Sequence, residues 1–362
     1  MVSMFRHEDL CQTTTTEQYY PEKAYDGPMP LRTGKLPPDV LKRITKNRGA
    51  PDTRVIVGPS IGEDAAVVKL GKIMLVLKTD PVTYASDLIG WYAVNVNAND
   101  VVTRGAEPAW FQAAILLPPG SEPSLAESIS KQISDAAKEL NIAVTGGHTE
   151  VTPGIEKPIV VGDMHGLVLG PKPISTSGAK VGDSIVMTKS AGIEGTSLIA
   201  RERRDDLLRV FDVQFVDRCA KFVFDPGLSI VKEALLALDF DVTAMHDPTE
   251  GGVAMGAEEL AQASGKPVEL WLDKIVVRPE TRRLCSKFAL DPLGLLGSGS
   301  LLATFDPKDA ERFVAALARI GIEASVIGEV LPGKGKSRIV NGKTTSPLSF
   351  SERDEVLKVL PP

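Results

Sequence analysis

The sequence predicts a protein of two domains, each a mixed α/β (α+β) layer structure. Its 362 residues are enough for about two domains of ordinary size. In both halves, short runs rich in Val, Ile and Leu alternate with stretches of helical periodicity. The Pro-, Ser- and Gly-rich stretch PKPISTSGAKVGD interrupts this pattern, which restarts after it. We therefore expect an N-terminal domain over 34–171 and a C-terminal domain over 172–340.

Both ends of the chain are expected to be tails. Residues 1–33 are polar, rich in Thr and interrupted by three prolines, which predicts a flexible segment that could fold over a site. Lys35 follows in RTGKLPP and could reach a phosphate if that segment closes, although a plain surface lysine is the simpler interpretation. The polar stretch 341–362 is expected to be a loosely attached C-terminal tail.

The N-terminal domain is expected to combine strands with three helices. Runs of β-branched and apolar residues bounded by Gly, Asp and Pro predict strands at 65–70, 72–80, 109–118, 142–147 and 159–170. A short helix with proline in its first turn is predicted over 37–47. Gly105 suits the position after a helix end, which predicts a helix over 87–104. An apolar stripe predicts a further helix over 124–140, capped by Ser121 or Ser124.

The C-terminal domain repeats the alternation. Strands are predicted at 183–192, 241–247, 267–273, 300–306 and 324–330, and a helix over 195–204. Two further helices begin with Asp-Pro, which suits an N-cap followed by the first helical position. These helices are predicted over 225–238 and 306–321.

Composition excludes several classes of function. The net charge is −6 and no dense Lys/Arg cluster is present, so nucleic acid is not an expected partner. No apolar run approaches the roughly 20 residues of a membrane-spanning helix. The three cysteines, Cys11, Cys219 and Cys285, are scattered, which favours reduced thiols in a cytoplasmic protein.

Four acidic residues of the N-terminal half stand where a fold could gather them. Asp64 opens one predicted strand and Asp80 closes another. Asp100 lies on an apolar helix with Asn97 one turn earlier, and Glu150 follows a predicted Gly-Gly turn. Carboxylates that share a buried crevice need a cation, and Mg²⁺ takes oxygen ligands. For each acid alone, a surface turn or a helix cap is the competing interpretation.

Two glycine pairs could bind phosphate, because glycine allows close backbone approach and free amides attract anions. One pair lies in TGGHTE and the other opens a predicted helix in DPTEGG; they are Gly146, Gly147, Gly251 and Gly252. Ordinary turns remain the alternative for both pairs. His148 and His246 lie in or next to these motifs and could contact phosphate or act as acid or base. The sequence contains no P-loop.

Taken in order, six motifs resemble the AIR synthase-related superfamily: GEDAAVV, KTDP, NVNANDVVTRGAEP, GGHTE, GIEGTSLIA and DPTEGG. That superfamily includes aminoimidazole-ribonucleotide (AIR) synthase, thiamine-monophosphate kinase, selenophosphate synthetase and the hydrogenase maturation protein HypE. The resemblance covers about residues 35–335, and three of its motifs look closest to the HypE branch.

The resemblance implies a two-domain AIR synthase-like fold and a homodimer in which the N-terminal sheets pair. It implies ATP and Mg²⁺ as cofactors, with Mg²⁺ ligands at Asp64, Asp80, Asp100 and Glu150. Catalytic roles fall on Asp64, Asp100, His148 and Asp247. Residues near the nucleotide would be Asp80, Asn97, Gly146, Gly147, Thr149, Glu150, Gly251 and Gly252.

The implied reaction is ATP- and Mg²⁺-dependent phosphoryl transfer that activates a carbamoyl-type or small-molecule oxygen. The substrate would be a small molecule or a carbamoylated protein, and metalloenzyme maturation proteins would be partners. The sequence departs from the HypE branch at Glu250, where a basic residue is frequent, and it lacks that branch's C-terminal cysteine, since its last cysteine is Cys285. Two alternatives stay open: a non-catalytic nucleotide-binding assembly factor, and a kinase resembling thiamine-monophosphate kinase.

Overall fold

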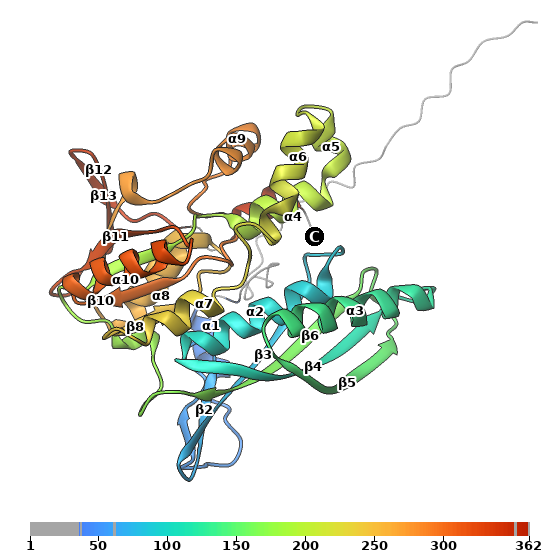
Figure 1. Cartoon of the computed structure of the whole chain (residues 1–362), viewed down its shortest axis with the longest axis horizontal. Coiled ribbons are helices and arrows are strands. Elements are labelled where there is room, and N and C mark those ends of the chain that lie inside the picture. The colour runs from blue at the N-terminus through green and yellow to red at the C-terminus, as the bar shows by residue number, and fades with distance from the viewer. Residues whose placement is uncertain (1–35, 37, 61–62, 351–352, 361–362) are drawn as a thin grey trace, which may run out of the picture. The chain divides into compact units, whose positions relative to one another are not determined.

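The computed structural model describes residues 36, 38–60, 63–350 and 353–360. The predicted N-terminal tail and Lys35 lie outside these residues. The described chain contains two β-sheets, each accompanied by helices (Figure 1), as the mixed α/β prediction requires. In this part of the chain, none of the helices has the length and apolar character of a membrane span.

The first sheet has six strands and is formed by the N-terminal half. Its strands are antiparallel to their neighbours except for the last pair, β4 and β5, which are parallel. In spatial order they are β1 (Val55–Val57), β2 (Ala66–Leu70), β3 (Ile73–Val82), β6 (Ile159–Val168), β4 (Ala106–Leu117) and β5 (Ala143–Val151). The short helix α1 (Pro38–Ile44) precedes them and begins at a proline, as predicted.

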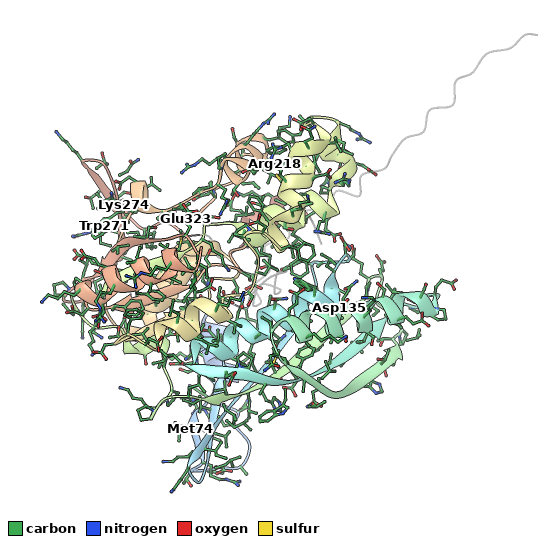
Figure 2. The ribbon with its side chains drawn as sticks, in the orientation of Figure 1. Met74, Asp135, Arg218, Trp271, Lys274 and Glu323 are labelled. Atoms are coloured by element: carbon green, nitrogen blue, oxygen red, sulfur yellow. The ribbon has the colours of Figure 1, made fainter. Side chains whose placement is uncertain are left out.

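Helices α2 (Ile89–Thr103) and α3 (Pro123–Glu139) cover one face of this sheet (Figure 1). Nearly every residue of α2 is buried, and Gly105 follows its end with φ 70°, which confirms the predicted helix end. On α3 the middle of the predicted stripe is buried and its ends, Leu125 and Leu140, are half-buried. The N-cap is Glu122 rather than Ser121 or Ser124. The Ser121 hydroxyl donates instead to the Pro118 carbonyl, and Pro123 occupies the first turn. Asp135 lies on the outer side of α3 (Figure 2). Its carboxylate is 2.5 Å from the Lys131 ammonium.

The opposite face of the first sheet remains accessible. Gly162 and Gly166 of β6 lie against α2, so the alternate residues of β6, which include Asp163 and His165, point to the other side. There Asp163 accepts hydrogen bonds from Thr79 and Gln112, both at 3.0 Å. Apolar side chains surround this polar centre, and they include Leu75, Leu77, Trp110, Val161 and Leu167. Trp110 keeps 39% of its surface exposed.

The second sheet has seven strands and belongs to the C-terminal half. In spatial order they are β13 (Thr344–Pro347), β12 (Arg338–Asn341), β9 (Val268–Trp271), β11 (Ala324–Val330), β7 (Ser184–Thr188), β10 (Leu302–Phe305) and β8 (Ala244–His246). The helices of this half are α4 (Ile193–Glu202), α5 (Arg204–Leu208), α6 (Val213–Ala220), α7 (Val231–Ala237), α8 (Gly252–Ser264), α9 (Pro279–Phe288) and α10 (Pro307–Arg319). Single 3-10 turns are η1 (Thr176–Gly178), η2 (Lys221–Val223), η3 (Leu272–Lys274) and η4 (Glu355–Lys358).

One Asp-Pro helix start is confirmed and the other is wrong. Asp306 caps α10 by accepting the Lys308 amide at 3.1 Å. The helix predicted from residue 225 begins only at Val231. The Lys189 ammonium binds the carbonyls of Gly227 and Ser229, at 3.3 and 2.5 Å, which diverts them from a helical ladder.

The chain after residue 341 differs from the expected loose tail. Strand β13 pairs with β12, and the later segment 354–360 is mostly buried. The Asp354 carboxylate accepts hydrogen bonds from the amides of Gly251, Leu296 and Val356, at 2.7, 3.2 and 2.7 Å. Val356 is fully buried. Polar composition concealed this attachment, because one buried carboxylate with backbone partners and a few apolar side chains are enough to hold the segment.

Candidate active site

Asp64 lies in a network that joins the two halves of the chain. Its carboxylate accepts a hydrogen bond from Arg104 Nη2 at 3.0 Å, and His246 Nδ1 lies 3.2 Å away. Arg104, at the end of α2, is fully buried and also pairs with Glu63. His246, the last residue of β8, places its Nε2 2.9 Å from the Glu259 carboxylate.

The charges of this network hold Asp64 in its ionised form. Burial alone would raise the pKa of Asp64, but His246 and Arg104 hold it well below its usual range. Burial would lower the pKa of His246, but the carboxylates of Asp64 and Glu259 raise it to about 10. The imidazole is therefore a cation at neutral pH.

The Lys78 ammonium lies beside two further carboxylates, those of Asp80 and Asp100. Its ammonium lies 2.8 Å from Asp100 Oδ2 and 3.8 Å from Asp80 Oδ2. Strand alternation places Lys78 and Asp80 on the face of β3 that looks toward α2, which carries Asp100. Burial raises the pKa of Asp100 to about 7, and the positive charge of Lys78 limits the rise. Asn97 donates to the Asp80 backbone carbonyl at 3.3 Å, so it supports this corner of the site.

Asp247 is a buried carboxylate without a hydrogen-bond partner among the described residues. It follows β8, is 2% exposed, and neither of its oxygens accepts a hydrogen bond within the described chain. Burial raises its pKa well above the ordinary value, and the charges of Asp100 and Asp64 add to the effect. Asn97 Oδ1 is a second buried oxygen without a partner among these residues. Oxygens of this kind are costly unless a ligand satisfies them.

Glu194, in the first turn of α4, adds a further buried acid. Burial raises the pKa of Glu194 to about 8, although a hydrogen bond from Ser298 lowers it in part. The charges of Glu250, Asp354 and Asp80 raise it further, which places Glu194 in the same electrostatic environment as the predicted site.

Glu194→Gln is expected to change how stability depends on pH. A carboxyl whose pKa is raised by folding loses stability as pH increases from its unfolded value, near 4.5, to about 8. Glutamine does not titrate, so the free energy of unfolding of the variant should rise relative to the wild type across that window, by up to about 5 kcal/mol. Urea unfolding at about pH 5 and pH 9 measures the difference, and parallel pH profiles of the two proteins would contradict it.

Glu150 and His148 lie away from the other predicted ligands within one copy of the chain. In register, Asp80 pairs with Gly162, Gly162 with Ala113, and Ala113 with Gly147. Three strand spacings, roughly 14 Å, therefore separate β3 from β5, and Glu150 is three residues further along its strand. One Mg²⁺ ion, with bonds of about 2 Å, cannot join Asp80 and Glu150 of the same copy.

The side chains of β5 instead face solvent. Glu150 accepts a hydrogen bond from the Thr152 hydroxyl at 2.8 Å, and its other oxygen lies 3.1 Å from His148 Nε2. Thr149 is exposed on the same strand and lines a groove of about 640 Å³ between β5 and α3. The predicted sites on this strand thus stand at the edge of the sheet, open to a second molecule.

The glycine pairs are explained partly by packing. Gly146 and Gly147 lie within β5 and not in the predicted turn. A Cβ atom on Gly147 would lie 2.3 Å from the Ala113 carbonyl oxygen, so the parallel pairing with β4 requires glycine there. Gly251 and Gly252 do open helix α8, as predicted, but the Gly251 amide already donates to Asp354. The Asp354 carboxylate of the protein itself therefore occupies the helix start at which a phosphate was predicted.

Sequence reasoning overlooked three residues of the site: Lys78, Arg104 and Glu194. Lys78 and Asp80 are two positions apart on one strand, and Asp100 and Arg104 are four apart on one helix. These spacings put each pair on one face, a signal that was available. Glu194 gave no such signal, because its burial depends on the packing of α4.

Two family models match the chain. The model described as "AIR synthase related protein, N-terminal domain" matches residues 62–168, and the corresponding C-terminal model matches 180–341. A candidate hydrogenase expression/formation protein of Methanocaldococcus jannaschii is 28% identical over 305 residues, which cover 82% of this chain and 88% of that protein. The carbamoyl dehydratase HypE of Rhizobium leguminosarum bv. viciae is 26% identical over 279 residues, covering 75% and 77% of the two chains.

Solved structures share the fold. HypE in a complex with HypF matches with a TM-score of 0.72 at 22% identity, covering 86% of this chain and 99% of that chain. HypE in complex with ATP matches with a TM-score of 0.65 at 25% identity, covering 83% and 92%. The fold, both family models and these relatives agree with the resemblance read from the motifs. The chain belongs to the AIR synthase related family, and its relatives include hydrogenase maturation proteins of the HypE type.

Proposed function

We propose that this protein uses Mg²⁺ and ATP to transfer a phosphoryl group to an oxygen of a carbamoyl-type or small-molecule substrate, as a HypE-like enzyme. The observation that carries the proposal is Asp247, whose two buried oxygens lack hydrogen-bond partners in the part of the chain that the structure describes and lie in the field of Asp64 and Asp100. A HypE that is similar to this chain over most of its length has been crystallised with ATP.

The donor set fits Mg²⁺. The unpartnered oxygens of Asp247 and Asn97 are hard ligands, and Asp64, Asp80 and Asp100 supply further carboxylates. No group of three His, Cys, Asp or Glu side chains in the described residues is arranged so that it could hold a metal ion by itself. A Mg²⁺ ion here would take one or two carboxylates and complete its shell with phosphate and water. When bound, Mg²⁺ would neutralise charge on the triphosphate.

The chain's own cations prepare the site for a polyanion. Arg104 and His246 fix the Asp64 carboxylate and keep it ionised. Each of them is buried, so its position is set before any ligand arrives. Glu250 and Asp247 would face the substrate, where an acidic lining favours a group that donates hydrogen bonds.

We further propose a homodimer that pairs the accessible faces of the first sheets. That face is apolar around Asp163 and exposes Trp110, which suits burial against an identical surface. A second copy would also bring His148 and Glu150 to a site that they cannot reach within their own chain. A maturation protein is the proposed partner, because a HypE relative has been crystallised with HypF. The buried thiols of Cys219 and Cys285 suit a cytoplasmic location.

Mixed dimers test the proposal. Asp80→Asn and Glu150→Gln should each abolish Mg²⁺-dependent binding of a non-hydrolysable ATP analogue, measured by calorimetry. When the two variants are co-expressed in equal amounts, about a quarter of the sites should return, because half of random dimers then contain one intact site. Absence of binding by the wild type would overturn the proposed function. Absence of recovery in the mixture would overturn only the shared site.

A further inference from the structure

Lys78 is the ammonium group that stands among the predicted metal ligands. Its side chain is 17% exposed, and it lies 2.8 Å from Asp100 and 3.8 Å from Asp80. Asp100 is 6% exposed, so this contact lies largely outside bulk water. Lys78 lies within the ten-residue strand β3 and is paired with Met164 of β6, so its backbone is held in the sheet and its flexible stem is the part that can move.

The cations of the site are divided between its carboxylates. Arg104 and His246 are committed to Asp64, while Lys78 is shared by Asp80 and Asp100. Arg104 is further tied to Glu63 and Thr176, and His246 is tied to Glu259, so neither can leave easily. The ion pairs found for Lys78 are those with Asp80 and Asp100. It is therefore the cation of this site with the greatest freedom to change partner.

A divalent ion and the Lys78 ammonium would compete for the same oxygens. An ion bound by Asp80 and Asp100 would lie within a few ångströms of the ammonium, where like charges repel strongly in a partly buried site. The four-carbon stem of lysine allows its charge to swing to another acceptor, and a phosphate oxygen is a suitable one. The divalent ion should therefore bind Asp80 and Asp100 at the same time as the Lys78 ammonium leaves them.

We propose that Lys78 is a positioning residue that occupies the Asp80–Asp100 pair until nucleotide arrives, and then moves to a phosphate oxygen, so that the divalent ion enters together with the nucleotide. This inference rests on the proposed function. It explains how the protein can stay folded without a metal although several carboxylates lie close together, because the Lys78 ammonium offsets part of their charge. It also predicts that free divalent ions bind the empty site poorly, although suitable ligands are present.

Mn²⁺ binding without nucleotide tests this role, with electron paramagnetic resonance of free Mn²⁺ as the readout. Lys78→Met and Lys78→Gln should bind Mn²⁺ at least about tenfold more tightly than the wild type, because a competing charge is gone. Lys78→Arg should resemble the wild type. Lys131→Met on the outer side of α3 removes the same charge elsewhere and should change nothing. Gln can still donate to Asp100, so it preserves the fold if Met does not.

The same variants should show the opposite effect with nucleotide. Lys78→Met and Lys78→Gln should bind the Mn²⁺ complex of an ATP analogue more weakly than the wild type, because a phosphate partner is lost. Equal Mn²⁺ affinity of the wild type and folded Lys78→Gln, without nucleotide, would overturn the inference. If the wild type binds no Mn²⁺ even with the analogue, the proposed function fails as well.

Discussion

Replacing Arg104 by methionine is expected to lower the free energy of unfolding by about 3–5 kcal/mol, the largest stability loss that we predict for one side chain. The guanidinium is fully buried at the end of α2 and forms ion pairs with Glu63 and Asp64. It also donates to the Thr176 hydroxyl at 2.9 Å. Methionine fills a similar volume but leaves two carboxylates without their shared cation, and an uncompensated buried charge is costly.

Urea unfolding followed by circular dichroism measures this loss, and Arg104→Lys is the informative comparison. Lysine keeps the charge but cannot bind Glu63, Asp64 and Thr176 at once, so it should recover only part of the stability. Arg209→Met, which removes an exposed arginine that pairs with Asp206 at 3.1 Å, should cost about 1 kcal/mol or less. A loss at Arg104 no greater than at Arg209 would show that the network is not a main support of the fold.

Asp247→Asn is expected to give a more stable protein that no longer binds Mg²⁺ and nucleotide together. Asp247 is buried without hydrogen-bond partners in the described chain. Its ionised carboxylate therefore lowers the stability of the ligand-free protein. Removing that charge should raise the free energy of unfolding by about 1–3 kcal/mol near pH 8, where the carboxyl is most costly. The amide is a poor Mg²⁺ ligand, so affinity for the metal–nucleotide complex should fall at least about a hundredfold.

Thermal unfolding and calorimetry at the same pH test both halves of this result. Asp241→Asn is the matched control, since Asp241 is exposed in the turn before β8 and should change neither quantity. A variant that is less stable than the wild type would mean that Asp247 has a structural partner after all. A variant that binds the complex normally would remove Asp247 from the site.

Local signals predicted the elements whose ends are set by their own residues. Helix α2 ends at Gly105 and α10 begins at Asp306, and both effects lie within one turn of the chain. Helix α7 was misjudged because Lys189, distant in sequence, binds the carbonyls that would have formed its first turn. The segment after residue 341 was misjudged for the same reason, since its partners are backbone amides near residues 251 and 296.

In the candidate site, too, some features could be predicted from local residues and others depend on partners distant in sequence. Carboxylates at strand ends and in an apolar helix were visible as unusual residue types, and Asp64, Asp80, Asp100 and Asp247 do share one electrostatic environment. The cations that balance them were not predicted, because a lysine or arginine on one face of an element is ordinary in sequence. Glu150 could not be placed, since its distance from Asp80 depends on the strand order of the sheet.

The attachment of residues 354–360 has a consequence for biosynthesis. The amides of Gly251, before α8, and of Leu296 donate to the Asp354 carboxylate, which is translated about sixty to a hundred residues later. A ribosome-bound chain can therefore form the first sheet early, while Gly251 and Leu296 wait for their acceptor until residues 354–360 emerge. Nascent chains of this protein should depend on chaperones more before that segment emerges than after it.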